Sequence, residues 1–340
     1  MNDPGPPAAP WLVADIGGTN VRFGLVAAGT RSVVDVQAFR CASFAGPAEA
    51  ARHYLAELAA RQGQAFRAPG WAAFAVATAV GDGRIDLTNS AWSFTRSEVE
   101  RALGLDGLLL LNDFEALALS LPALGAHQLR CHGVMPVARG TLAVLGPGTG
   151  LGVGGLVETD GGWRAIAGEG GHATLAAADA FEDDLLRVVR TEFGHVSAER
   201  LLSGIGLPVL HRAVAKVQGL PFEALDAQQI GQRGAARSDP VCERTLDTFC
   251  AMLGSFAGNV ALTLGARGGL YIGGGVIPHF IEFFFASRFR ERFEAKGRFR
   301  TYLQGVPTAL IIEPHAALAG AAAAIEGRVA RLAKANDHAA

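Results

Sequence analysis

Hydrophobic and polar residues follow two rhythms along this chain, and the order of the rhythms repeats. Short apolar runs bounded by glycines predict β-hairpins at 12–26 and 142–157, and further strands at 32–41, 71–80, 107–111, 163–167, 269–272 and 307–313. Apolar residues at helical spacing predict helices at 47–62, 97–103, 114–121, 239–264, 278–296 and 316–333. The stretch 181–237 also reads as helical, with breaks at 204–206 and Pro221. Hairpin strands followed by alternating strands and helices, twice, predict two α/β domains with a mixed sheet in each.

Local signals refine two of these helices. Ser97 with Glu100 three residues later predicts a capping box at the start of the helix 97–103. Pro278 suits the first turn of the helix 278–296. A chain of 340 residues exceeds one ordinary core, which again favours two domains.

Composition narrows the class of protein. A net charge of −2 with 18% charged residues does not favour binding to nucleic acid or to an anionic membrane surface. No apolar stretch approaches the about 18 residues of a membrane span, and the first residues lack the pattern of a signal peptide. The four cysteines form no C-x-x-C pair and no zinc spacing. We therefore expect a cytoplasmic protein with scattered core thiols.

The tips of the two hairpins carry the first candidate chemistry. Asp15 ends an apolar strand, and Gly17, Gly18 and Thr19 follow it; Gly148 and Thr149 occupy the second tip. Such tips bring backbone N–H groups and a hydroxyl close to an anion, and an aspartate beside them can hold a hydrated Mg²⁺. An ordinary tight turn explains each tip equally well when it is considered alone.

Two familiar nucleotide-binding patterns are excluded. Gly150, Gly152 and Gly155 match G-x-G-x-x-G, but a second strand follows them where a dinucleotide fold requires a helix. None of the three lysines follows the glycine run of a P-loop. Two facing glycine tips that hold one polyphosphate remain the better hypothesis, and they point to phosphoryl transfer.

Polar residues at strand ends and in glycine-rich loops supply a substrate set. Asn112 and Asp113 follow an apolar strand; they suit either a helix N-cap or, for Asp113, a general base that takes a proton from an attacking hydroxyl. Glu169 and His172 lie in a glycine-rich loop, and Glu199 follows Ser197, which is a plausible N-cap. Carboxylates and amides of this kind can bind adjacent sugar hydroxyls. The glycines 273–275 suit a flat ligand such as adenine or a plain strand-to-helix turn.

In their order, the motifs D-I-G-G-T-N, L-N-D-F, G-P-G-T-G-L-G, G-E-G-G-H, H-V-S-A-E-R-L-L-S-G and G-G-G resemble the ATP-dependent bacterial glucokinase family. The resemblance runs from about Leu12 to Ile325. It implies the two-domain actin-like ATPase (ribonuclease H-like) fold with an interdomain cleft. The small domain would comprise 1–122 plus 315–340, and the large domain 123–314. Family members are typically cytosolic homodimers.

The resemblance also implies a role for each motif residue. Asp113 would be the catalytic base for the glucose 6-hydroxyl. Glucose would be bound by Asn89, Asn112, Asp113, Glu169, His172 and Glu199. ATP would be bound by Asp15, Gly17, Gly18, Thr19, Gly148, Thr149, Gly273 and Gly274, with Mg²⁺ at Asp15. The expected reaction is ATP-dependent phosphorylation of D-glucose to glucose 6-phosphate, at the entry to glycolysis.

Rival functions stay open. A kinase for another hexose or for a carboxylate would share the nucleotide motifs, and a non-catalytic ATP-binding regulator would share the fold. The chain lacks the cysteine-rich zinc loop and the N-terminal helix-turn-helix of related regulators: Ala173–Ala176 follow His172, and the first strand begins by Leu12. A pure nucleotide switch has no need of the polar set formed by Asn112, Asp113, Glu169 and Glu199.

Overall fold

The computed structural model of the chain describes residues 9–27, 30, 32–78, 80–81, 83–87 and 90–337. These residues divide into two compact units, one drawn from 9–121, 160–163 and 314–337 and the other from 122–159 and 164–313. The boundary expected from the sequence, with 1–122 and 315–340 in a small domain and 123–314 in a large one, stays a prediction. No helix among the described residues has the length and apolar character needed to cross a membrane.

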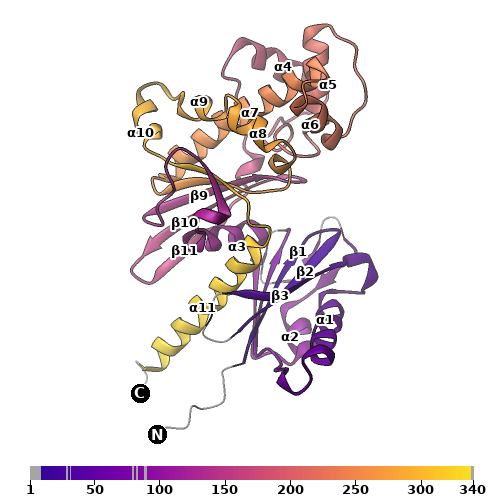
Figure 1. Ribbon diagram of the computed structural model, residues 1–340, viewed down its shortest axis with the longest axis vertical. Coiled ribbons are helices and arrows are strands. Elements are labelled where there is room, and N and C mark those ends of the chain that lie inside the picture. Colours follow the sequence, from indigo (N-terminus) through magenta and orange to yellow (C-terminus); the bar gives the residue numbers. More distant parts are fainter. Residues whose placement is uncertain are drawn as a thin grey trace. The chain divides into compact units, whose positions relative to one another are not determined.

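The first unit is built on a five-stranded sheet of order β3-β2-β1-β4-β7 (Figure 1). Its elements are β1 (Trp11–Ile16), β2 (Asn20–Val26), β3 (Val33–Arg40), α1 (Pro47–Gln62), β4 (Trp71–Val76), β5 (Ile85–Asp86), β6 (Ser93–Phe94), α2 (Arg96–Leu103), β7 (Gly107–Asn112), α3 (Asp113–Ser120) and α11 (Ala316–Asp337). β1, β2 and β3 form an antiparallel meander, and β4 and β7 run parallel to β1. The carboxyl ends of β1, β4 and β7 therefore share one edge of the sheet.

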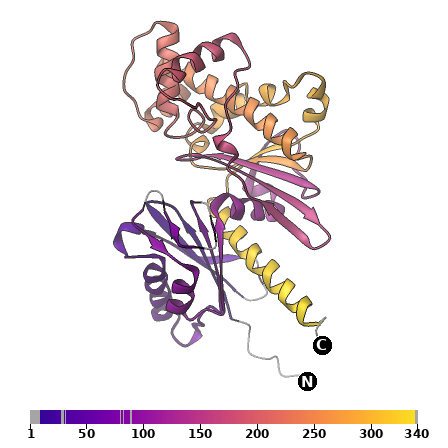
Figure 2. The same ribbon diagram turned by 180° about the vertical axis from the view of Figure 1, so that it is seen from behind.

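Alternation along β1 explains why both faces of this sheet are covered. Leu12, Ala14 and Ile16 belong to a buried cluster with residues of α1 and α2, whereas Val13 packs against α11. α3 lies beside α11, as both views show (Figures 1 and 2). The two helices approach so closely that a Cβ at Gly320 would collide with the carbonyl oxygen of Ala116.

The second unit repeats the plan in a six-stranded sheet of order β11-β10-β9-β12-β13-β8. Its elements are β8 (Leu129–His132), β9 (Thr141–Pro147), β10 (Leu151–Thr159), β11 (Gly162–Ile166), α4 (Ala180–Arg190), α5 (Leu207–Gln218), α6 (Ala227–Ala235), α7 (Pro240–Leu264), β12 (Gly269–Ile272), α8 (Ile281–Ala286), α9 (Phe289–Glu294), α10 (Arg300–Gln304) and β13 (Thr308–Ile311). The first two residues of β11 are grouped with the first unit. β12 runs parallel to β9 and β13. The long helix α7 (orange in Figure 1) is buried along most of its length and joins the sheet and the other helices in one core.

Several predicted boundaries are wrong for local reasons. Thr95, not Ser97, caps α2, and its capping box uses Glu98. The helix expected at 278–296 is divided because Ser287 is extended, with a ψ of 177°, and its hydroxyl accepts a hydrogen bond from the Phe289 backbone N–H at 3.2 Å. The stretch expected to be helical over 181–237 is irregular at 191–206, and Ser197 caps only a turn there, by accepting from the Arg200 N–H. β8 was not predicted.

Candidate active site

The first hairpin tip lies at the shared carboxyl edge of the sheet in the first unit. The N–H of Gly17 donates to the carbonyl of Asn20 at 2.9 Å, which closes the turn between β1 and β2. Cys41 also holds the turn in place: its N–H donates to the Thr19 carbonyl, and its thiol donates to the Gly17 carbonyl. The Thr19 side chain is exposed. A fixed turn with an exposed hydroxyl is what a phosphate-binding tip requires.

Asp15 has a partner that the motif analysis missed. Its Oδ2 lies 3.1 Å from Nη1 of Arg22, the residue directly opposite on β2. The carboxylate side chain is only 24% exposed. Burial raises the pKa of Asp15, and the charges of Arg22 and His315 oppose that rise. The hairpin register could have revealed Arg22, since a tight turn after Ile16 places it across from Asp15.

Asn112 and Asp113 stand at the same sheet edge as the tip. Asn112 is in register with Val76 and, through it, with Ile16, so two strand spacings of about 10 Å in total separate β7 from β1. Asn112 is the N-cap of α3: its Oδ1 accepts from the Phe114 N–H at 2.9 Å, and its Nδ2 donates to the Thr78 carbonyl at 3.2 Å.

Asp113 is the first residue of α3, and its Oδ1 also accepts from the Phe114 N–H, at 2.9 Å. The capping interpretation is therefore confirmed for Asn112. It does not compete with a catalytic role for Asp113, because the cap fixes the start of α3 and thereby holds the neighbouring carboxylate in place.

The glycine loops of the second unit contact each other. In the second tip the Gly148 N–H donates to the Gly150 carbonyl at 2.9 Å, and the Gly204 N–H donates to the Gly148 carbonyl at 2.7 Å. Gly273 donates to the Leu145 carbonyl at 2.8 Å. Gly274 has a φ of +83°, and a Cβ there would run into the Pro147 carbonyl oxygen. In the sequence these loops are separate motifs. In the structure they lie side by side at the ends of β9 and β12.

The second unit also gathers the polar residues of the glycine-rich loop. Glu199 Oε2 accepts a hydrogen bond from the Leu151 backbone N–H at 2.9 Å, and its Oε1 lies 3.8 Å from His172 Nδ1. The Glu199 N–H donates to the Gly171 carbonyl at 2.9 Å. The Glu169 carbonyl accepts from the His172 N–H at 3.0 Å, which closes the short turn that carries both side chains. Glu199 therefore links this loop to the second hairpin tip.

The predicted residues thus form two groups, each within its own unit. Asp15, Gly17, Gly18, Thr19, Asn112 and Asp113 share one sheet edge in the first unit, and Gly148, Thr149, Glu169, His172, Glu199, Gly273 and Gly274 cluster in the second. Asn89 lies outside the described residues. Throughout the described part of the chain no three His, Cys, Asp or Glu side chains gather to hold a metal ion. Asp15 is a carboxylate beside the Gly17–Thr19 turn, which has the form of a phosphate-binding tip, and is therefore the candidate ligand for a metal ion there.

Comparison with known proteins gives the family. The family model described as Glucokinase matches residues 12–328. The chain belongs to the glucokinase family. A glucokinase from Paramagnetospirillum magneticum is 48% identical over 92% of this chain and 96% of its own length.

Solved structures place the glucokinase-family chain in its fold. A glucokinase from an Antarctic psychrotroph is 38% identical, with a TM-score of 0.85 over 94% of this chain and 99% of that one. At 19% identity, a ROK family glucokinase from Streptomyces griseus, solved with glucose and AMPPNP, has the same fold, with a TM-score of 0.59 over 92% of this chain and 98% of that one. The actin-like ATPase fold expected from the sequence is confirmed.

Proposed function

We propose that this chain phosphorylates D-glucose at its 6-hydroxyl with ATP and that Asp113 acts as the base. Membership of the glucokinase family supports the reaction. One structural observation carries the residue assignment: Asp113 stands at the same sheet edge as the Gly17–Thr19 tip, at the start of a helix whose cap fixes it. A base for phosphoryl transfer must stand close to the phosphate-binding tip.

Residues of both units would bind glucose. Asn89, Asn112 and Asp113 would contact the sugar from the first unit; Glu169, His172 and Glu199 would contact it from the second. A carboxylate accepts hydrogen bonds from adjacent sugar hydroxyls, and the neutral carboxamide of Asn112 both donates and accepts. Asp113 would orient the 6-hydroxyl and take its proton as the oxygen attacks the γ-phosphorus.

ATP binding falls to the glycine loops. The tips at Gly17–Thr19 and Gly148–Thr149 would hold the phosphates through backbone N–H groups and threonine hydroxyls. The loop at Gly273–Gly274 would lie against adenosine, where the absence of side chains permits close approach. Asp15 fits a hydrated Mg²⁺, because such an ion needs one or two protein carboxylates beside the phosphates and supplies charge neutralisation there. Closure of the two units over the substrates would exclude water, which competes with glucose as phosphoryl acceptor.

The proposals for assembly, compartment and pathway come from the resemblance to the glucokinase family. We propose a cytoplasmic homodimer that serves the entry of glucose into glycolysis. Nucleic acid and membrane lipid are not proposed as partners.

A substrate panel tests the reaction. The full chain is incubated with Mg-ATP and glucose, mannose or fructose, and the sugar phosphate and ADP are both quantified. Glucose 6-phosphate formed in a one-to-one ratio with ADP, fastest with glucose, is the expected result. Faster turnover of another hexose would make the chain a kinase for that sugar. ATP hydrolysis that no sugar stimulates would replace the proposal with a regulatory ATPase. Exchange of ATP for ADP or polyphosphate identifies the phosphoryl donor.

A further inference from the structure

A hollow in the second unit is unconnected with any residue assigned above to ATP. It has a volume of about 410 Å³ and lies between the β10–β11 face of the sheet, the loop that follows β11, and α7. Its lining is largely apolar, with Val153, Ile166, Leu175, Phe256, Val260 and Leu264 among the contributing residues. That volume falls in the range of sites that bind small organic molecules.

Polar groups run along one wall of this hollow in a regular row. Ser255, Asn259 and Thr263 follow each other at four-residue spacing on α7 and all line it. Asn259 and Thr263 are both exposed residues that line the hollow. Within the described residues, their side chains make no hydrogen bond to the protein, so both can bind water or a ligand. An apolar hollow edged by an exposed amide and an exposed hydroxyl suits an amphipathic ligand.

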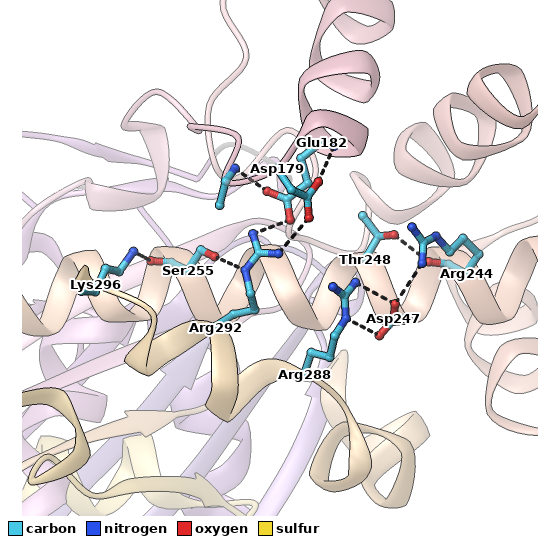
Figure 3. Close-up of polar contacts among 10 residues, drawn as sticks. Asp179, Glu182, Arg244, Asp247, Thr248, Ser255, Arg288, Arg292 and Lys296 are labelled. Atoms are coloured by element: carbon cyan, nitrogen blue, oxygen red, sulfur yellow. Dashed lines mark hydrogen bonds and ion pairs between the residues drawn. The ribbon is translucent and has the colours of Figure 1, made fainter. Parts of the chain in front are cut away.

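Ser255 is held differently from the other two. Its hydroxyl accepts from Arg292 Nε at 3.1 Å, and its carbonyl accepts from Lys296 Nζ at 2.8 Å (Figure 3). Arg292 also donates to Glu182 at 2.6 Å and to Asp179, the N-cap of α4, at 3.1 Å. These contacts join α7 to α9 and to Asp179, the residue that caps α4 and at which the loop after β11 ends.

The opposite wall is the loop that carries the sugar-binding candidates. Ala167, Gly168, Gly170 and the run Ala173–Ala176 line the hollow, and Glu169 and His172 lie between them in the sequence. A molecule in the hollow would pack against the backbone of this loop and restrict its motion.

We infer that this hollow binds an uncharged, mainly aromatic or aliphatic small molecule with a carbonyl or hydroxyl directed at Asn259 and Thr263, and that its binding strengthens glucose binding through the 167–176 loop. The second half of the inference rests on the glucose binding proposed above. By linkage, glucose must then strengthen binding in the hollow by the same factor.

The test uses prodan, an uncharged naphthalene ketone whose emission shifts in apolar surroundings, as the probe on the full chain. Thr263→Trp fills the hollow from an exposed position, so the core is not disturbed. Thr301→Trp, on exposed α10 in the same unit, is the matched control. We expect saturable binding of one prodan per chain, weakened by about tenfold or more in Thr263→Trp and unchanged in Thr301→Trp. Saturating prodan should tighten glucose binding, measured by calorimetry without ATP, by about fivefold, and glucose should tighten prodan binding equally.

Three results would overturn the inference. Unaltered prodan affinity in Thr263→Trp places the probe elsewhere. If Thr263→Trp weakens prodan binding as expected but prodan does not change the glucose affinity of the wild type, the two sites are not coupled. A smaller assembly in Thr263→Trp than in the wild type, by sedimentation, shows that a second copy of the chain covers the hollow. A chain that binds prodan as expected but forms no sugar phosphate would instead contradict the proposed reaction, which separates the two failures.

Discussion

Glu199 Oε2 accepts a hydrogen bond from the backbone N–H of Leu151 at 2.9 Å, so a candidate sugar-binding carboxylate is bonded to the base of the second hairpin tip. The Cα of Gly150 lies so close to the same carboxylate that a Cβ there would collide with it. His172 stands on the other oxygen, 3.8 Å away. One side chain therefore connects the two substrate-binding loops of the second unit.

This connection separates Glu199 from Glu169. Glu199→Ala removes the partner of the Leu151 N–H, so we expect weaker binding of both glucose and ATP. A hydrogen bond to a charged group is worth about 1.5–3 kcal/mol, which corresponds to roughly 10–100-fold in affinity. Glu169→Gln should weaken glucose binding by a similar factor and leave ATP binding unchanged. Calorimetric titration of each ligand alone checks this; equal losses of both ligands in Glu169→Gln would contradict its assignment to the sugar.

The individual elements and loops of this site could be predicted from the sequence, but the contacts between them could not. The helix Pro47–Gln62 and the strand Gly269–Ile272 follow from local periodicity alone, and both are confirmed at the predicted bounds. The glycine tips were also located from local signals. The bond from Leu151 to Glu199 joins residues 48 positions apart through the irregular segment 191–206, where no periodicity predicts the backbone path. Long-range pairing of that kind depends on the fold, which local patterns do not contain.

Asp15 is expected to lower stability in exchange for function. Because burial raises its pKa, the charged carboxylate is disfavoured in the folded state, and stability falls as the pH rises from its ordinary value of 3.8 through the raised one. The cost is largest at pH values above the raised pKa. Asp15→Asn should therefore raise the melting temperature at pH 7, since the lost ion pair to half-exposed Arg22 contributes little.

The same variant should lose activity. We expect kcat/KM for Mg-ATP to fall by about 100-fold or more, because a preorganised charge at the phosphate site is lost. Asp86→Asn, at an exposed position in the same unit, is the control for both measurements. A melting temperature lower than that of the wild type would show that the Arg22 pair outweighs the burial of Asp15.

The buried thiols should be inert in the native protein. All four cysteines are free, and burial raises the pKa of Cys242 and Cys250 to about 12. At pH 8 only about one in ten thousand of these groups is a thiolate, which is the reactive form. A short pulse of N-ethylmaleimide followed by peptide mapping should label only the half-buried Cys131 in the native state and all four thiols in guanidinium. Cys131→Ser provides the control, and labelling of Cys242 at the rate of Cys131 would contradict the prediction.

The most direct test of the account is a comparison of turnover and glucose binding in Asp113→Asn. The substitution keeps the size of the side chain and its ability to accept from the Phe114 N–H, while it removes the base. We predict that kcat for glucose 6-phosphate formation falls by about 10²–10⁴-fold. Glucose affinity, measured by calorimetry, should change by less than about tenfold, because the asparagine carbonyl can still accept from the 6-hydroxyl and the loss of a charged acceptor costs about 1 kcal/mol. Near-normal kcat in this variant, with glucose still bound, would exclude Asp113 as the base and contradict the mechanism.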